Sequence, residues 1–197
     1  MTAVLLFAKA PRRGQVKTRL AADLGEEAAL RLYREIGARV AAGVGERYAL
    51  TVWHDPPEAR DEMRAWLGEH PYLPQRGRDL GERLSHAFAW HFAKGDGPVI
   101  VIGADAPDVS GSTVAEAERH LRDHDAVIGP SVDGGYYLLG LRAPSPTVFE
   151  GIPWGTDQVF SVTVARCRVC HLQVQVLSVL RDLDTAADLE ALGIRRP

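Results

Sequence analysis

The chain alternates short apolar runs with segments of helical periodicity from one end to the other, and this pattern limits its possible folds most strongly. The apolar runs predict strands at Val4–Phe7, Tyr48–Trp53, Pro98–Gly103, Asp125–Gly129, Tyr136–Leu141 and Val174–Val179. Strands that alternate with helices are typical of an α/β protein with a mostly parallel sheet. Because 197 residues, 46% of them apolar, suffice for one core, we expect a single domain over residues 1–197.

Helices are expected between most of these strands. Apolar residues at three- and four-residue steps predict one buried helix face, formed by Ala29, Tyr33, Ile36, Gly37, Val40 and Val44. Further helices are expected from Pro56 to Leu67, from Leu80 to Phe92, after a cap at Ser112 or Thr113, from near Thr156, and from Asp184 to Leu192. Every residue of Val99–Ile102 is apolar, so this strand should be buried on both faces and central in the sheet.

A basic loop follows the first predicted strand. Five cations precede the first acidic residue, Asp23: Lys9, Arg12, Arg13, Lys17 and Arg19. Since the whole chain has a formal charge of −3, this is a local positive field. Gly14 allows the backbone to turn, and Lys17–Leu20 can open a helix whose free N–H groups favour an anion. The loop lacks Walker A spacing, and it is either a phosphate-binding loop or a solvated basic surface.

Carboxylates and glycines follow two later strands. Ligands of α/β sheets bind at the carboxyl ends of strands. Asp105 comes directly after the most apolar strand, and it is either a turn residue or a ligand of Mg²⁺ or Mn²⁺. Asp133 lies beside Gly134 and Gly135, which permit close backbone approach, and it is a turn residue, a group that orients other ligands, or a base.

Other candidates each have a structural alternative. Asp182 and Asp184 follow the last strand. Either Asp184 caps the final helix, or one of the pair completes a metal site. Asp79 is either a helix cap or part of a nucleotide site near the same sheet edge. Trp154 either stacks on a base or sugar or fills the core.

Composition and spacing argue against several classes of protein. Cys167 and Cys170, followed by His171, match a haem-attachment pattern, but they end a predicted helix and no export signal precedes them. A thioredoxin-like pair would open a helix, and zinc would need two more ligands, so ordinary helix residues are expected. The first apolar run is too short to span a membrane and reaches Lys9 without a secretory cleavage pattern, so we expect a cytoplasmic protein. The mixed charge makes no case for nucleic acid as the main partner.

Several motifs together resemble one bacterial family. They are Phe7-Ala8-Lys9-Ala10-Pro11, Gly14, Val16-Lys17-Thr18-Arg19-Leu20, Gln75, Gly77, Asp79-Leu80-Gly81-Glu82-Arg83, Ile102-Gly103-Ala104-Asp105-Ala106-Pro107, Gly129-Pro130, Asp133-Gly134-Gly135-Tyr136-Tyr137 and Trp154-Gly155-Thr156. The chain resembles the glycosyltransferase-A-like family of small transferases, some of which are assigned to arsenosugar biosynthesis. It is similar, more distantly, to 2-phospho-L-lactate and molybdenum cofactor guanylyltransferases.

The resemblance implies the nucleotide-diphospho-sugar transferase fold, a Rossmann-like three-layer α/β/α sandwich with a mostly parallel mixed sheet. In such folds the first loop wraps the nucleotide phosphates and an Asp after a central strand holds the metal. Carried over here, Lys9, Lys17 and Arg19 are the phosphate candidates and Asp105 is the metal ligand. Rigid Pro107 keeps Asp108 out of the metal site.

From these patterns we expect a Mg²⁺- or Mn²⁺-dependent transferase that uses a nucleotide-activated donor, favouring a nucleotide sugar, and a small-molecule acceptor. A nucleotidyltransferase that releases pyrophosphate and a non-catalytic nucleotide-binding regulator remain alternatives. No nucleic acid or membrane partner is expected, and we expect either a monomer or a homodimer. The expected site comprises Lys17 and Asp133 in catalysis; Lys9, Gly14, Lys17, Arg19, Asp79, Gly81 and Arg83 for the nucleotide; Gly134, Gly135, Tyr136, Trp154 and Thr156 for the substrate; and Asp105 and Asp184 for the metal.

Overall fold

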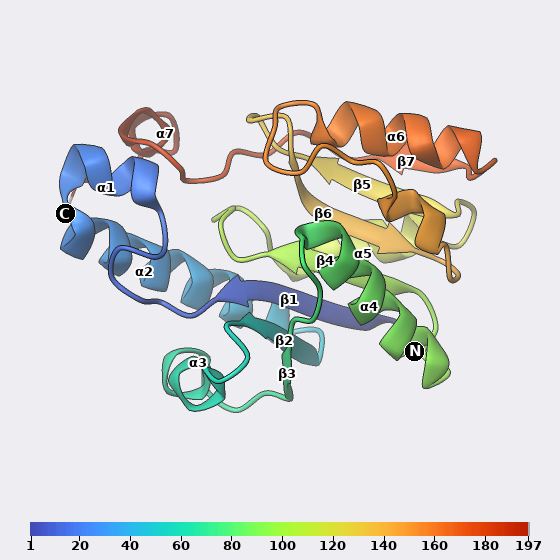
Figure 1. Ribbon diagram of the computed structural model, residues 1–197, viewed down its shortest axis with the longest axis horizontal. Coiled ribbons are helices and arrows are strands. Elements are labelled where there is room, and N and C mark those ends of the chain that lie inside the picture. The colour runs from blue at the N-terminus through green and yellow to red at the C-terminus, as the bar shows by residue number, and fades with distance from the viewer. Residues whose placement is uncertain (197) are drawn as a thin grey trace.

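The computed structural model describes residues 1–196, which form a seven-stranded mixed sheet of order β3-β2-β1-β4-β6-β5-β7 (Figure 1). The strands are β1 (Ala3–Lys9), β2 (Leu50–Asp55), β3 (Tyr72–Pro74), β4 (Val99–Gly103), β5 (Ala126–Pro130), β6 (Tyr136–Leu141) and β7 (Val174–Val176). Only β6 runs against its neighbours, because a short turn joins it to β5. The expected α/β class is confirmed, and the apolar strand β4 is central as predicted.

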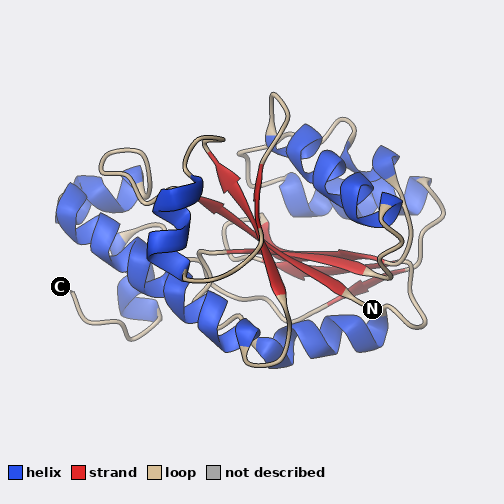
Figure 2. Ribbon diagram, turned by 90° about the horizontal axis from the view of Figure 1, so that it is seen from below, coloured by secondary structure: helices blue, strands red, loops and turns tan. Residues whose placement is uncertain are grey.

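Helices cover both faces of the sheet, as Figure 2 shows. They are α1 (Thr18–Leu24), α2 (Glu26–Gly45), α3 (Arg60–Leu67), α4 (Leu80–Ala93), α5 (Gly111–His120), the 3-10 helix η1 (Pro146–Phe149), α6 (Val159–Val169) and α7 (Ala186–Ala191). Side chains of α1, α2, α3, α5 and α7 pack in one core cluster, and those of α4, η1 and α6 pack in the other. Strand alternation divides β4 accordingly, with Ile100 and Ile102 on the first side and Val99 and Val101 on the second.

Several helix ends differ from the sequence predictions. The helix expected from Pro56 begins at Arg60, because residues 56–59 form a turn closed by the Ala59 N–H and the Pro56 carbonyl. Ser110, rather than Ser112 or Thr113, caps α5, and Thr113 is its capping-box partner. Asp184 does not cap the final helix, since Thr185 does so with Asp188. The helix expected near Thr156 begins at Val159.

Strand boundaries also shift. The strand expected at Tyr48–Trp53 is β2 (Leu50–Asp55), because the N–H of Tyr48 still bonds to Val44 at the end of α2. The last strand ends at Val176 rather than Val179.

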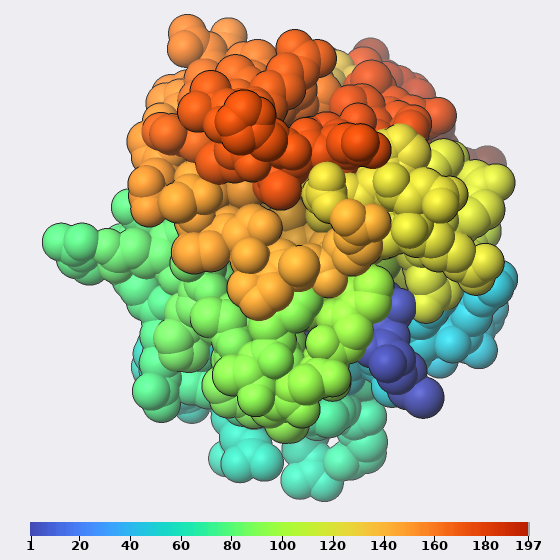
Figure 3. Space-filling view, turned by 90° about the vertical axis from the view of Figure 1, so that its right-hand side faces the viewer, coloured from blue at the N-terminus to red at the C-terminus, as the bar shows by residue number. Residues whose placement is uncertain are grey.

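The two ends of the sheet differ in their loops. Strand β1 runs from the N-terminus toward α1 and α7 (Figure 1). At one end of the sheet, the Gly97 N–H donates to the Met1 carbonyl. Figure 3 shows the dark blue start of the chain beside the light green segments on that side. The opposite end gathers the loops after β1, β2 and β4, because these strands are parallel. Antiparallel β6 starts at that same end, so Tyr136 also lies there.

Candidate functional site

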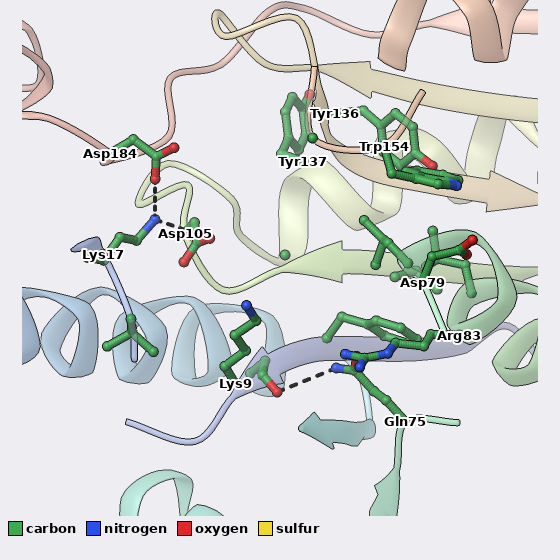
Figure 4. A pocket seen from close by; sticks show the side chains of 18 of the residues that line it. Lys9, Lys17, Gln75, Asp79, Arg83, Asp105, Tyr136, Tyr137, Trp154 and Asp184 are labelled. Carbon is green, nitrogen blue, oxygen red and sulfur yellow. Dashed lines mark hydrogen bonds and ion pairs between the residues drawn. The ribbon is translucent and has the colours of Figure 1, made fainter. Parts of the chain in front are cut away.

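A cavity of about 720 Å³ opens at the carboxyl end of β1 and β4 (Figure 4). Its walls come from the loop after β1, the start of α4, the end of β4, the start of β6 and the loops that carry Trp154 and Asp184. A volume of this order suits a ligand of nucleotide size. The cavity has a charged end around Lys17 and an aromatic end around Trp154, with Lys9 between them (Figure 4).

The five cations of the first loop have different environments. Arg12 pairs with Glu58 and Glu62, and Arg13 pairs with Glu26. Neither arginine lines the cavity, so their charges are compensated outside it. The three other cations line the cavity: Lys9, Lys17 and Arg19. The loop therefore presents to the cavity the three cations that the family resemblance selects.

Lys17 lies between two carboxylates at the charged end. Its side chain is only 6% exposed, and its Nζ atom is 3.1 Å from Asp105 Oδ2 and 2.7 Å from Asp184 Oδ1. Burial alone would lower the pKa of Lys17, but the two carboxylates outweigh it and raise the pKa above its ordinary value. Arg19 adds a second cation on Asp184, with Nη2 2.6 Å from Oδ2.

The backbone explains why residues so distant in sequence meet here. The segment after β7 runs beside the end of β5, where the Leu180 N–H donates to the Pro130 carbonyl. It then crosses to the loop after β4, where the Leu183 N–H donates to the carbonyl of Asp105. Lys17 is the N-cap of α1 and has a left-handed backbone with φ 48°, a conformation uncommon for residues other than glycine.

Two buried carboxylate oxygens near this cluster are left without a hydrogen-bond partner in the described part of the chain. Within residues 1–196, Asp105 Oδ1 is shielded from solvent and has no hydrogen-bond partner, and the same is true of Asp182 Oδ1. Burial raises the pKa of Asp182 to about 7. The described part of the chain has no cluster of three metal-ligating side chains, so a metal would need further oxygens, such as those of a phosphate. Asp105 and Asp184, already bridged by a cation, fit such a shared site.

The aromatic end is built on α4. Trp154 packs on Gly81, where a Cβ atom would lie 2.5 Å from the indole Nε1. The ring of Tyr136 meets Trp154 edge-on at a centroid distance of 6.3 Å. Trp154 lines the cavity and also packs against the core, and its stacking on a base or a sugar stays a prediction. Asp79 lines the same end and accepts the N–H of Glu82, so it caps α4 as well.

Arg83 and Gln75 also line this end of the cavity, on the side opposite Trp154 (Figure 4). Arg83 donates from Nε to the carbonyl of Gly77, and its Nη1 is 3.1 Å from Asp55 Oδ2. The side-chain nitrogen of Gln75 donates to the carbonyl of Trp53 at 2.9 Å, which orients the amide. Gln75 belongs to a family motif, but the sequence alone suggests no role for it.

Six of the expected site residues do not line the cavity, namely Gly14, Gly81, Asp133, Gly134, Gly135 and Thr156. Gly81 lies directly behind Trp154. Asp133 accepts the N–H of Gly135 at 2.9 Å, which is a local turn. Thr156 donates its hydroxyl to the carbonyl of Pro153. In the structure without a ligand, the side chains of Asp133 and Thr156 therefore bond to their own loops.

Tyr33 is a cavity residue that sequence reasoning assigned to the core alone. Its hydroxyl accepts the N–H of Lys9 at 3.1 Å and donates to the carbonyl of Lys9 at 2.9 Å. This fixes the end of β1, where the loop departs. Periodicity predicts that the ring of Tyr33 lies on the buried face of α2. No sequence pattern predicts that its hydroxyl bonds to the backbone of Lys9.

The similarities to known proteins agree with this architecture. A family model described as "Uncharacterized protein conserved in bacteria (DUF2064)" matches residues 38–156. A crystal structure from Desulfovibrio desulfuricans G20, provisionally described as a nucleotide-diphospho-sugar transferase, has 38% sequence identity and a TM-score of 0.92, over 97% of this chain and 85% of that chain. No curated protein sequence matches.

Two further structures share the fold at low identity. One is CMP:2-keto-3-deoxy-manno-octonic acid synthetase complexed with CTP, at 13% identity and a TM-score of 0.58, over 97% of this chain and 96% of that one. The other is 4-diphosphocytidyl-2C-methyl-D-erythritol synthase from Anaerococcus prevotii DSM 20548, at 11% identity and 0.60, over 98% and 99%. The nucleotide-diphospho-sugar transferase type of fold is therefore confirmed. The closer resemblance to arsenosugar enzymes and guanylyltransferases stays a prediction. In residues 1–196, no helix combines the length and the apolar character that a membrane crossing requires.

Proposed function

The chain belongs to the bacterial family described as DUF2064, and on this premise we propose that it is a Mg²⁺-dependent transferase with a nucleotide-activated donor, favouring a nucleotide sugar. The observation that carries the proposal is the convergence of Lys9, Lys17 and Arg19 with Asp105 and Asp184 in one cavity at a sheet edge. Cations that bind phosphates and carboxylates that bind a metal are complementary parts of one nucleotide diphosphate site. The provisional description of the Desulfovibrio relative supports it.

The chain's own residues divide the work by chemistry. Asp105 and Asp184 would hold the metal, which when bound offsets charge that develops on the departing phosphate. Lys9 and Arg19 would contact the phosphate oxygens, and Lys9 is well placed because it rises from the end of β1 into the middle of the cavity (Figure 4). Trp154 and Tyr136 form an apolar wall on which a planar base or a sugar ring can pack.

Catalysis at such a site rests on positioning and on electrostatics. Two charges about 4 Å apart interact with roughly 4 kcal/mol at an effective dielectric of 20, against about 1 kcal/mol in water. A few fixed charges in a partly enclosed cavity can therefore hold a diphosphate. Asp133 does not line the cavity, so we assign it no step in the reaction.

The first test is a panel of nucleotide sugars and nucleoside triphosphates, titrated by calorimetry with and without Mg²⁺. We expect at least one ligand whose affinity rises tenfold or more when Mg²⁺ is present. Asp105→Asn should abolish most of that metal-dependent gain. Asp108→Asn is the matched control, because Asp108 is exposed and lies outside the cavity. Absence of any metal-dependent nucleotide binding would remove the proposal.

A nucleotidyltransferase is the second candidate, since the two low-identity structures with this fold are a CTP complex of a CMP-sugar-acid synthetase and a diphosphocytidyl synthase. In that reaction an acceptor phosphate attacks the α-phosphorus of a nucleoside triphosphate, and pyrophosphate leaves. Release of pyrophosphate, rather than of a nucleoside diphosphate, discriminates the two. A non-catalytic regulator would bind tightly and turn over no acceptor.

A further inference from the structure

We propose that the ammonium group of Lys17 is a stand-in cation, which occupies the position between Asp105 and Asp184 in the free protein and excludes a divalent metal from it. This inference rests on the proposed function, because it assigns the metal to these two carboxylates. It adds that the metal must displace Lys17, so that a metal ion alone binds weakly and binds well only when other anions, such as phosphate oxygens, draw the ammonium away.

The geometry of Lys17 supports exclusion rather than coexistence. Its Nζ atom contacts Asp105 Oδ2 at 3.1 Å and Asp184 Oδ1 at 2.7 Å, so it lies on the oxygens that face each other across the gap (Figure 4). A metal bound by the same two oxygens would stand beside the ammonium, and two cations at such a separation repel each other. The side chain of Lys17 is 6% exposed and that of Asp105 is 44% exposed, so solvent screens the ammonium poorly but reaches the metal position from the side of Asp105.

The contacts of Lys17 are also unlike those of an ordinary surface ion pair. Lys17 itself has a left-handed backbone conformation, which is costly for a residue other than glycine, so the loop holds it there against strain. Arg19 contacts Asp184 on its other oxygen, Oδ2, and is 69% exposed, so it compensates that carboxylate from outside without filling the gap. Position, and not charge alone, therefore distinguishes Lys17.

The remaining carboxylate oxygen indicates what happens when Lys17 leaves. Asp105 Oδ1 is shielded from solvent and has no partner among residues 1–196. The ammonium of Lys17 contacts Oδ2 and not Oδ1, so Oδ1 is free to coordinate a hard cation. Lys17, once displaced, is still a cation in a cavity that also carries Lys9 and Arg19, so phosphate oxygens are its natural new partners.

The test is a titration of Mn²⁺ alone, followed by the electron paramagnetic resonance signal of free Mn²⁺. Lys17→Met removes the ammonium and keeps most of the length of the side chain. It should bind Mn²⁺ at least tenfold more tightly than the wild type, although the variant lacks a residue of the proposed site. Tighter metal binding after loss of a site residue is the opposite of what a simple supporting role predicts.

Two controls separate position from charge. Arg13→Met removes one positive charge from the same loop, where Arg13 is exposed and paired with Glu26, and should change Mn²⁺ affinity by less than threefold. Arg19→Met removes a cation that touches Asp184 from outside, and its gain should be clearly smaller than that of Lys17→Met. If Lys17→Met binds Mn²⁺ no more tightly than the wild type, or no more tightly than Arg19→Met, the inference is wrong.

A second measurement uses the wild type, in case Lys17→Met folds poorly. The chain has only three lysines, Lys9, Lys17 and Lys94, so reductive methylation followed by mass spectrometry reports each one. In the free protein Lys17 should react more slowly than the exposed Lys9, and saturating Mg²⁺ alone should accelerate its methylation at least threefold. Lys94, far along the chain beside Trp90, serves as the internal reference.

The outcomes distinguish this inference from the proposed function. If the wild type binds Mn²⁺ and Asp105→Asn weakens that binding, but neither Lys17→Met nor Mg²⁺-dependent labelling behaves as stated, the metal site stands and the stand-in role of Lys17 falls. If no variant binds Mn²⁺ and Asp105→Asn changes nothing, the metal dependence of the proposed function falls together with the inference.

Discussion

At the scale of single residues, the charge of the site depends on where each cation of the basic loop finds its acidic partner, inside the cavity or outside it. Arg12 and Arg13 are paired with acids on the outer side of the loop, whereas Lys17 is paired within the cavity. Asp182 differs from all of these, because burial keeps its pKa raised. A buried carboxyl of this kind links the stability of the fold to pH.

Asp182→Asn should remove part of the pH dependence of stability. The folded protein keeps the Asp182 proton up to about pH 7, whereas the ordinary pKa of an aspartate is 3.8. The stabilisation is therefore complete below about pH 4 and is lost as pH rises through 7. The amide of the variant cannot ionise, so the variant should gain roughly 1–3 kcal/mol relative to the wild type between pH 4.5 and 7.5. Urea unfolding across that range measures the difference.

Comparing the variant with the wild type at each pH cancels the contributions of other titrating groups to the free energy of unfolding. His91 works in the opposite direction, because burial lowers its pKa and so destabilises the fold as pH falls below 6.5. Both proteins carry His91, and its contribution cancels. A difference between Asp182→Asn and the wild type that does not vary with pH would contradict the buried-carboxyl account.

At the scale of elements, the site depends on how closely the loops pack against helix ends. Gly134 has φ 88°, and its carbonyl accepts the N–H of Phe160 at the start of α6. A Cβ atom at Gly134 would overlap the carbonyl of Asp157. Gly134 therefore brings the backbone of its loop close to α6, and a substrate contact of Gly134 stays a prediction.

Gly134→Ala should therefore destabilise the fold strongly. The left-handed backbone costs about 1 kcal/mol for alanine, and the overlap with Asp157 forces the loop away from α6, so we expect a total of about 2–4 kcal/mol. Gly155→Ala is the matched control, because Gly155 has φ 82° but open space around its Cβ position, and should cost only the backbone term of about 1 kcal/mol. Equal losses in the two variants, measured by urea unfolding, would exclude the packing role of Gly134.

The elements show what sequence patterns can and cannot predict. Continuous apolarity identified β4, and alternation with helices identified the class, because both depend on burial along the chain. Helix starts were less predictable, since Thr185 rather than Asp184 caps α7 and either residue has suitable chemistry. Because Asp184 does not cap the helix, its carboxylate can contact Lys17. The two residues are 167 positions apart in the sequence, so no local sequence pattern predicts this contact.

At the scale of the whole molecule, the cavity joins the two ends of the chain. The basic loop follows β1, whereas Asp184 belongs to the segment after β7, and the Asp105 loop lies between them. Strand-end positions predicted that Lys17 and Asp105 would share one sheet edge. Their direct ion pair could not be predicted, because it depends on the left-handed turn at Lys17 and on the path of the last segment.

Because the ligand site draws on segments from both ends, metal and phosphate together should stabilise the entire fold more than the sum of their separate effects. A ligand at 100 times its Kd adds about 2.7 kcal/mol, which raises the Tm of a chain of this size by roughly 5–10 °C. In the wild type, Mg²⁺ alone should give a small shift, pyrophosphate alone a small shift, and the two together most of that range. In Lys17→Met, Mg²⁺ alone should already give a larger shift, and pyrophosphate should add less. Scanning calorimetry of both proteins under the four conditions measures this coupling. A full shift of the wild type with Mg²⁺ alone would mean that the carboxylates are open to the metal and that Lys17 does not compete with it.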